Sequence, residues 1–348
     1  MPAARSSTSV ASDAAAPRRL SIGKLRGLQQ MADADGILAM CAMDHRGSMQ
    51  RLIRPDAPEA VEYEELVKYK LDLTRALAPD ATAVLLDPVY GAAQAISAGA
   101  LPASTSLLVS LEETGYETEA QGRVTTLLPG WSAEKVRRMG ASAVKILLYY
   151  RPDLEENAAR QREVVRRVAE ACAEVDLPFL LEPIVYPVFE AERDPAFFAS
   201  LKGELVVRSA RDLTPLGVDV LKSEFPEDLH YQQDEGRLRE ACERLDDASR
   251  VPWILLSAGV TFDEFERQVE IACRAGASGF LGGRAVWEEA MRIPDGSDRR
   301  RWLSSIGVER LRRLHGLAAE HGSPWWRNWG SSPADAGGAI SETWYRGY

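Results

Sequence analysis

The stretch VDVLKSEFP, residues 218–226, sets a lysine, Lys222, in a run that alternates apolar and short residues and stops at Pro226. This pattern is typical of a buried strand. A lysine on such a strand lies among apolar neighbours, which disfavour the charged ammonium and lower its pKa. The stretch alone leaves three interpretations open: a nucleophilic amine, a buried ion pair, or a segment that is not a strand.

Short apolar runs of the same kind recur from Gly36 onward, and helical patterns follow them. Eight strand–helix repeats in about 250 residues are what a (β/α)8 TIM barrel requires. The runs are continuously apolar, as expected for a parallel sheet whose outer face is covered. A doubly wound open sheet is the alternative, but no G-x-G-x-x-G turn follows the first run. The predicted strands are 37–43, 83–86, 106–111, 143–150, 179–186, 218–222, 253–259 and 279–284.

The composition predicts one barrel domain, residues 20–329, between two less ordered segments. Residues 1–19 are rich in Ala and Ser and contain no apolar signal-peptide core, so we expect a disordered leader. Residues 330–348 are rich in Gly, Ser and Ala, so we expect a flexible tail. The polar excursion 114–126 is expected to form a long loop or a small hairpin.

The overall charge and the apolar patterning exclude several classes of protein. The chain has 348 residues and a net charge of −10, which disfavours nucleic acid and anionic lipid as partners. No apolar run approaches the roughly 20 residues of a membrane span. We therefore expect a cytoplasmic protein that binds neither nucleic acid nor membrane, and a homo-oligomer remains open.

The cysteines and histidines show no metal-ligand spacing. The four cysteines form no C-x-x-C pair, and each lies in an apolar stretch, where a free cysteine behaves as a small hydrophobic residue. The four histidines are scattered along the chain. We predict no metal site.

Charged and polar residues stand at the carboxyl ends of the predicted strands, where barrels collect their functional groups. One or two charged residues there would be unremarkable. Two lysines and several carboxylates at one mouth are hard to explain by packing. These strand-end residues are Asp44, Asp87, Glu112, Lys145, Glu182, Lys222, Ser257 and 282–284.

The two lysines predict Schiff-base chemistry. If Lys145 and Lys222 both face the barrel interior, each ammonium disfavours charging of the other, and burial acts in the same direction. We expect an amine neutral enough near pH 7 to attack a ketone and form an iminium. Such an enzyme needs no cofactor beyond the covalent imine, which we assign to Lys222.

Carbon–carbon cleavage also needs a base and a group that holds hydroxyls. Glu182, followed by Pro183 in an apolar strand, fits a base with a raised pKa, although Glu182 and Lys222 could instead be a buried ion pair. Asp44 is the candidate for polarising hydroxyls. We favour a turn-capping role for Asp87 and a structural, hydrogen-bonded role for His45 over a sugar contact.

A phosphorylated substrate needs an anion site, and the last two strands end in suitable groups. The ends of these strands are where barrels commonly bind phosphate. Backbone N–H groups, a helix N-terminus and a guanidinium would cradle the anion there. The alternative to phosphate binding is that the Arg284 guanidinium forms a salt bridge on the rim of the barrel. The candidates are Ser257, Gly259, Gly283 and Arg284.

Taken together, these stretches resemble the class I tagatose 1,6-bisphosphate aldolase family. The resemblance covers roughly residues 24–326. The matching segments are AMDHRG (42–47), LDPVYG (86–91), VKILLYY (144–150), LEP (181–183), VDVLK (218–222), LSAGV (256–260), GGRAVW (282–287) and SPW (323–325).

The resemblance implies a (β/α)8 fold and reversible cleavage of a ketose 1,6-bisphosphate to dihydroxyacetone phosphate and glyceraldehyde 3-phosphate. A phosphorylated ketose is therefore the expected partner. Lys222 matches the Schiff-base lysine, Lys145 the second lysine and Glu182 the acid/base carboxylate. Asp44 matches the active-site aspartate, and Arg46 is a further predicted substrate- or phosphate-binding residue. The phosphate-binding loops match at Ser257, Gly259, Gly283 and Arg284.

One motif departs from the family, because His45 stands where Gln usually follows the aspartate. Residues 252–295 look at least as much like a sister group that cleaves 6-deoxy-6-sulfofructose 1-phosphate to dihydroxyacetone phosphate and sulfolactaldehyde. A non-catalytic sugar-phosphate-binding regulator and a barrel lyase acting on a keto acid are further alternatives.

Overall fold

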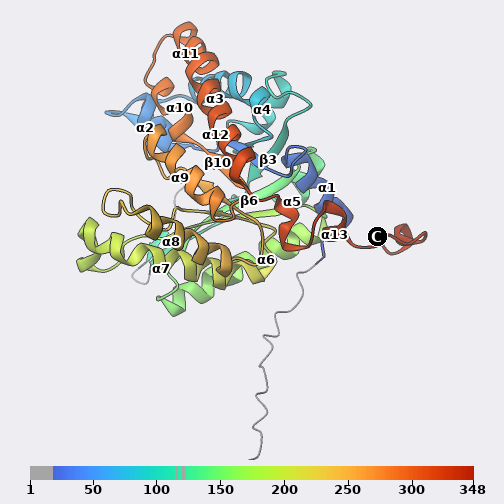
Figure 1. Cartoon of the computed structure of the whole chain (residues 1–348). Helices are drawn as coiled ribbons and strands as arrows, with labels where there is room; N and C mark the ends of the chain where they lie inside the picture. The colour runs from blue at the N-terminus through green and yellow to red at the C-terminus, as the bar shows by residue number, and fades with distance from the viewer. Residues whose placement is uncertain (1–18, 115–116, 120–121) are drawn as a thin grey trace, which may run out of the picture.

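A closed barrel of eight parallel strands forms the centre of the molecule (Figure 1). The computed structural model describes residues 19–114, 117–119 and 122–348. Each strand pairs with the strands that precede and follow it among the eight, and the first pairs with the last. The predicted TIM barrel is confirmed. Its strands are β1 (Leu38–Ala42), β2 (Ala83–Leu86), β3 (Ser106–Ser110), β6 (Ala143–Tyr149), β7 (Phe179–Ile184), β8 (Val220–Ser223), β9 (Trp253–Leu256) and β10 (Gly279–Gly282).

Helices surround the barrel, and buried apolar residues of many of them pack with strand residues in one cluster (Figure 1). A π-helical turn, Leu303–Gly307, joins α11 to α12. The helices are α1 (Ile22–Met31), α2 (Gly47–Ile53), α3 (Tyr63–Leu77), α4 (Ala92–Ser97), α5 (Ala133–Arg138), α6 (Glu155–Glu174), α7 (Pro195–Leu213), α8 (Glu235–Ala248), α9 (Phe262–Arg274), α10 (Arg284–Met291), α11 (Gly296–Trp302), α12 (Val308–His321) and α13 (Pro333–Gly337).

Two local features add to the predicted strand–helix repeats. Helix α7 was not among the predicted elements, although Asp194 caps it by accepting a hydrogen bond from the N–H of Ala196 and Pro195 stands at its first position. Within the excursion 114–126, β4 (Glu117–Glu119) and β5 (Gly122–Val124) pair in antiparallel orientation.

One cluster of buried residues fills the barrel interior, and it decides where the functional groups point. Side chains alternate between the two faces of a strand. Lys145, Glu182 and Lys222 each follow a member of this cluster by two residues, so all three face inward above the apolar filling. The strand members of the cluster are Leu38, Met40, Ala42, Ala83, Leu85, Leu108, Ala143, Leu180, Val220, Ile254 and Leu281.

The opposite end of the barrel is closed by the two ends of the described chain. Leu28, Trp325 and Ala336 are fully buried in the same cluster, and the N–H of Leu20 donates to the carbonyl of Ala336. Figure 1 shows α13 beside α1 at this end, with the C-terminus beyond them. The predicted leader lies outside the described residues except for Arg19, and the flexibility of the tail stays a prediction, although Pro333–Gly337 is helical. No helix in the described ranges is long and apolar enough to cross a membrane.

Candidate active site

Adjacent strands bring two lysines and a glutamate together at the base of a cavity of about 470 Å³. Lys222 Nζ lies 2.7 Å from Glu182 Oε1, and Lys145 Nζ lies 2.9 Å from Glu182 Oε2. The carboxylate of Glu182 therefore bridges the two ammonium groups. The three side chains are only 1–8% exposed. The sequence prediction brings these residues together correctly, and the ion-pair interpretation of Glu182 and Lys222 also holds.

Lys145 is surrounded by carboxylates rather than by apolar groups. Its Nζ lies 2.8 Å from Asp44 Oδ2 and 2.7 Å from Glu112 Oε1, in addition to Glu182. Burial lowers the pKa of Lys145, but these three carboxylates outweigh burial and raise its pKa well above the ordinary value. The expectation that burial and the second lysine would lower this pKa is wrong for Lys145. The three carboxylates therefore favour its charged form.

The predicted raised pKa of Glu182 is also wrong. Burial alone raises the pKa of this carboxyl, but Lys145 and Lys222 together hold it below its ordinary value. The carboxyl of Asp44 behaves in the same way, because Lys145 and His45 lower its pKa more than burial raises it. Both groups are carboxylates at neutral pH, so both can accept a proton.

Glu112 differs from the other two carboxyls of the cluster. It follows β3, and its Oε2 is buried without a hydrogen-bond partner in the described structure. Burial raises its pKa despite the contact with Lys145. Its position at a strand end gave the only signal in the sequence, and no role was predicted for it.

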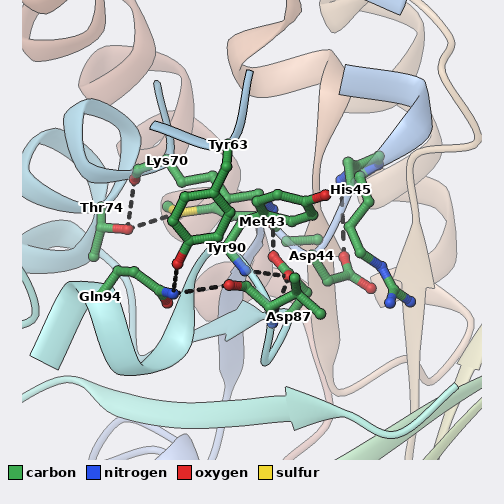
Figure 2. A network of polar contacts seen from close by, with 12 residues as sticks. Met43, Asp44, His45, Tyr63, Lys70, Thr74, Asp87, Tyr90 and Gln94 are labelled. Atoms are coloured by element: carbon green, nitrogen blue, oxygen red, sulfur yellow. Dashed lines mark hydrogen bonds and ion pairs between the residues drawn. The ribbon is translucent and has the colours of Figure 1, made fainter. Parts of the chain in front are cut away.

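The two residues for which structural roles were favoured give opposite outcomes (Figure 2). Asp87 caps its turn as predicted, because its Oδ1 accepts hydrogen bonds from the N–H groups of Val89 and Tyr90. The prediction that His45 is hydrogen-bonded is wrong for its Nδ1 atom. This atom has no hydrogen-bond partner among the described residues and lies 3.7 Å from Asp44 Oδ1. Burial lowers the pKa of His45 to about 4, so the ring is neutral at pH 7.

A buried lysine that the sequence analysis missed lies behind this pair. Lys70, on α3, places its Nζ 2.6 Å from Asp87 Oδ2 and donates to the carbonyl of Met43 at 2.6 Å. A signal was present in the sequence, because Lys70 falls within the buried stripe of α3 with Leu66 and Leu73.

The predicted phosphate-binding loops adjoin the cavity that holds the lysines. Gly259 and Arg284 line a second cavity of about 280 Å³. The N–H of Gly283 donates to Ser257 Oγ at 3.4 Å. A Cβ on Gly283 would lie 2.9 Å from His45 Cε1, so this loop packs directly on a residue that lines the first cavity.

Arg284 is available for an anion. It makes no ion pair or hydrogen bond with the residues the structure describes, so the alternative of a rim salt bridge is not supported. Gly259 has a φ of 83°, and a Cβ there would lie 2.7 Å from the guanidinium carbon of Arg284. The glycine therefore allows the guanidinium to rest against the loop.

Two further arginines line the large cavity. Arg46 donates from Nη2 to the carbonyl of Glu112 at 2.7 Å. Arg51, one turn further along α2, is exposed and was not predicted. Within the described ranges, no group of three or more His, Cys, Asp or Glu side chains is arranged to hold a metal ion.

Comparisons with known proteins identify the family of the chain. Residues 38–289 match the model of the DeoC/LacD family aldolases. The chain is 34% identical to a tagatose 1,6-diphosphate aldolase of Listeria monocytogenes over 336 residues, covering 90% of this chain and 96% of the relative. It is 32% identical to that of Staphylococcus haemolyticus over 325 residues, covering 87% and 97%.

Solved structures share the fold. An archaeal fructose 1,6-bisphosphate aldolase superimposes with a TM-score of 0.56 at 20% identity, covering 85% of this chain and 99% of that one. Fructose-bisphosphate aldolase from Plasmodium falciparum gives a TM-score of 0.65 at 14% identity, covering 88% and 98%. The chain belongs to the DeoC/LacD family of aldolases, as its motifs predict.

Proposed function

We propose that this aldolase cleaves a ketose 1,6-bisphosphate of the tagatose type, reversibly, to dihydroxyacetone phosphate and glyceraldehyde 3-phosphate through an imine on Lys222. The observation that carries the proposal is the bridge from Lys222 through Glu182 to Lys145, with contacts of 2.7 and 2.9 Å. The tagatose 1,6-diphosphate aldolases among the relatives support the substrate. An archaeal aldolase of the same fold was captured with its catalytic lysine bound to a carbinolamine, which supports the chemistry.

Imine formation starts with proton transfer from Lys222 to Glu182. The carboxylate is in hydrogen-bond reach of the ammonium, so it can accept the proton and release a neutral amine. The amine attacks the substrate's ketone carbon and forms a carbinolamine. Glu182 returns its proton to the carbinolamine hydroxyl, which leaves as water and gives the iminium, so Glu182 is a carboxylate again. Lys145 keeps its charge throughout, because three carboxylates hold its proton, and it is therefore an electrostatic and positioning group rather than a second nucleophile.

Cleavage uses the same carboxylate as a base. Glu182 removes the proton from the hydroxyl on C4, the C3–C4 bond breaks, and its electron pair moves into the iminium to form an enamine. The hydroxyl-bearing fragment leaves as the aldehyde. The enamine then takes at C3 the proton that Glu182 holds, and water hydrolyses the resulting iminium to release dihydroxyacetone phosphate from Lys222. Asp44 holds the substrate's hydroxyls, since its ionised carboxylate lines the cavity beside Lys145.

The two ends of the substrate meet different cations. We expect one phosphate to bind at Ser257, Gly259, Gly283 and Arg284. Gly259 and Arg284 line the second cavity, and Arg284 makes no ion pair with a described residue. The far anion lies at the mouth of the large cavity, near Arg46. The guanidinium of Arg46 already donates one N–H to the carbonyl of Glu112, so it is held in place for a charge-assisted contact.

A cleavage assay with a substrate panel tests the proposal. The panel contains tagatose 1,6-bisphosphate, fructose 1,6-bisphosphate and 6-deoxy-6-sulfofructose 1-phosphate, each with and without EDTA. We expect EDTA-resistant cleavage, with the highest kcat/KM for the tagatose compound. A higher kcat/KM for the sulfonate would mean that the substrate carries a sulfonate at C6 in place of the phosphate. Tight binding without cleavage of any compound would indicate a regulator.

A further inference from the structure

We propose that the buried ion pair of Lys70 and Asp87 is a positioning device that holds Asp44 in place for carbon–carbon cleavage. Neither residue touches the cavity of about 470 Å³, so both would act through the peptide that carries Asp44. This inference rests on the proposed function, because it assumes that Asp44 contacts the reacting sugar.

The ammonium of Lys70 makes two short contacts at once (Figure 2). Nζ lies 2.6 Å from Asp87 Oδ2 and donates to the carbonyl of Met43 at 2.6 Å. The Lys70 and Asp87 side chains are 1% and 0% exposed. A hydrogen bond from a charged donor to a carbonyl is roughly twice as strong as a neutral one, and burial shields this one from bulk solvent.

The contact at Met43 controls Asp44 because the two residues share a peptide unit. The carbonyl of Met43 and the N–H of Asp44 lie in one plane, so holding that oxygen fixes the start of Asp44. The φ torsion and the side-chain torsions of Asp44 then remain to be set, and its Oδ2 is held 2.8 Å from Lys145 Nζ.

Other elements hold the neighbouring groups of the same strand end. The N–H of Met43 donates to the carbonyl of Leu85 at 2.8 Å, and Trp287 Nε1 donates to the carbonyl of Ala42 at 2.9 Å. Lys70, on α3, holds the carbonyl of Met43. Asp87 in turn links this strand end to the turn after β2, because its Oδ1 accepts from Val89 and Tyr90 while its Oδ2 faces Lys70.

Stability alone does not account for two charges at this depth. A buried ion pair is often no more stabilising than apolar residues of similar volume, because taking both charges out of water offsets their attraction. An apolar pair could fill the space but could not hold the carbonyl of Met43. The function that remains for the charges is to fix the geometry of the strand end beside the reacting groups.

A matched pair of double variants tests this role. Lys70→Met with Asp87→Asn removes the ion pair without leaving a lone buried charge, and the new amide can still cap the turn. The control is Lys24→Met with Asp219→Asn, a buried pair of the same chemistry at the other end of the barrel, with Nζ 2.6 Å from Oδ2. The Asp219 carboxylate also accepts from the N–H of Phe179, which an amide oxygen can replace.

Four quantities are measured for each protein: kcat and KM for cleavage, the fraction of Lys222 reduced by borohydride in the presence of dihydroxyacetone phosphate, and Tm. We expect the Lys70/Asp87 variant to keep the reduced imine but to lose on the order of 10- to 100-fold in kcat, as displaced reacting groups do. The control is expected to lose Tm with kcat near that of the wild type. A merely structural role for Lys70 would lower Tm in both variants and kcat in neither.

A kcat within about twofold of the wild type for the Lys70/Asp87 variant would overturn the positioning role. If that variant does not fold, Lys70→Arg decides the question, because it keeps a cation opposite Asp87 but cannot place a donor where the ammonium stands. A lower kcat is expected for it, and a wild-type kcat would overturn the role. Failure of the proposed function would instead appear in the wild-type protein, as no cleavage and no reduced imine, and the inference would fall with it.

Discussion

Replacing Lys145 by methionine tests the electrostatic account of the active site. The side chain is 1% exposed, and its ammonium contacts three carboxylates at 2.7 to 2.9 Å. Removing one partner of a buried ion pair leaves uncompensated charge and costs about 3–5 kcal/mol. We therefore expect Lys145→Met to lower the free energy of unfolding near pH 7.5 by about that amount.

The loss should depend on pH in a defined direction. The pKa values of Asp44 and Glu182 are lowered in the folded protein from ordinary values of 3.8 and 4.5. The stability that these groups contribute is present above their unfolded pKa values and is lost as the pH falls through the folded values. Without Lys145 both carboxyls take up protons more readily, so the penalty should be smaller near pH 5 than near pH 7.5.

Urea denaturation followed by tryptophan fluorescence at the two pH values measures this penalty. Adding Glu112→Gln to Lys145→Met removes one carboxylate and should recover about 1 kcal/mol or more, as expected for coupled neighbours. The exposed pair of Arg193 and Glu190 is the surface control, and Arg193→Met should change stability little. A loss below about 1 kcal/mol for Lys145→Met, or a loss that does not vary with pH, would refute the reasoning.

Further predictions follow from single residues. Burial raises the pKa of Glu112, so its carboxylate form weakens the fold as the pH rises; Glu112→Gln should therefore keep or raise Tm near pH 8, and a lower Tm would contradict this. Glu182→Gln should lower kcat by about 10²- to 10⁴-fold, the usual contribution of a general base, and a smaller loss would assign the base elsewhere. The pKa of His45 is about 4, so His45→Gln should leave the shape of the kcat profile between about pH 5 and 8 unchanged, whereas a moved limb would show that the ring titrates there. In Gly259→Ala, the new Cβ would meet the guanidinium of Arg284 at 2.7 Å, so KM should rise about tenfold, or ~1.4 kcal/mol, for the bisphosphate, while the affinity for unphosphorylated dihydroxyacetone should not change.

Periodicity was sufficient to predict the barrel, whereas the inward direction of its two lysines was a condition of the prediction and not its result. The run around Lys222 reads as a strand, and the barrel then orders the strand ends around one mouth. Helix α7 was not predicted. The signal at its start is a helix cap formed by Asp194 and Pro195, which apolar periodicity does not detect.

Electrostatics could not be predicted from the sequence, because the partners of a charge are distant along the chain. Asp44 lies 101 residues before Lys145, and Glu112 lies 33 residues before it. A strand that looks apolar suggests a lysine without partners. The predicted shift of the pKa of Lys145 therefore had the wrong sign. The same cause reversed the prediction for Glu182, since its pKa depends on two lysines brought to it by neighbouring strands.

The most direct test of the central claim is chemical capture of the imine. The wild-type protein is incubated with dihydroxyacetone phosphate, reduced with borohydride, digested and mapped by mass spectrometry. The imine mechanism predicts a single reduced adduct on Lys222, with Lys145 unmodified because its three carboxylates keep it protonated. No adduct, an adduct on Lys145, or an adduct that persists in Lys222→Met would contradict the mechanism.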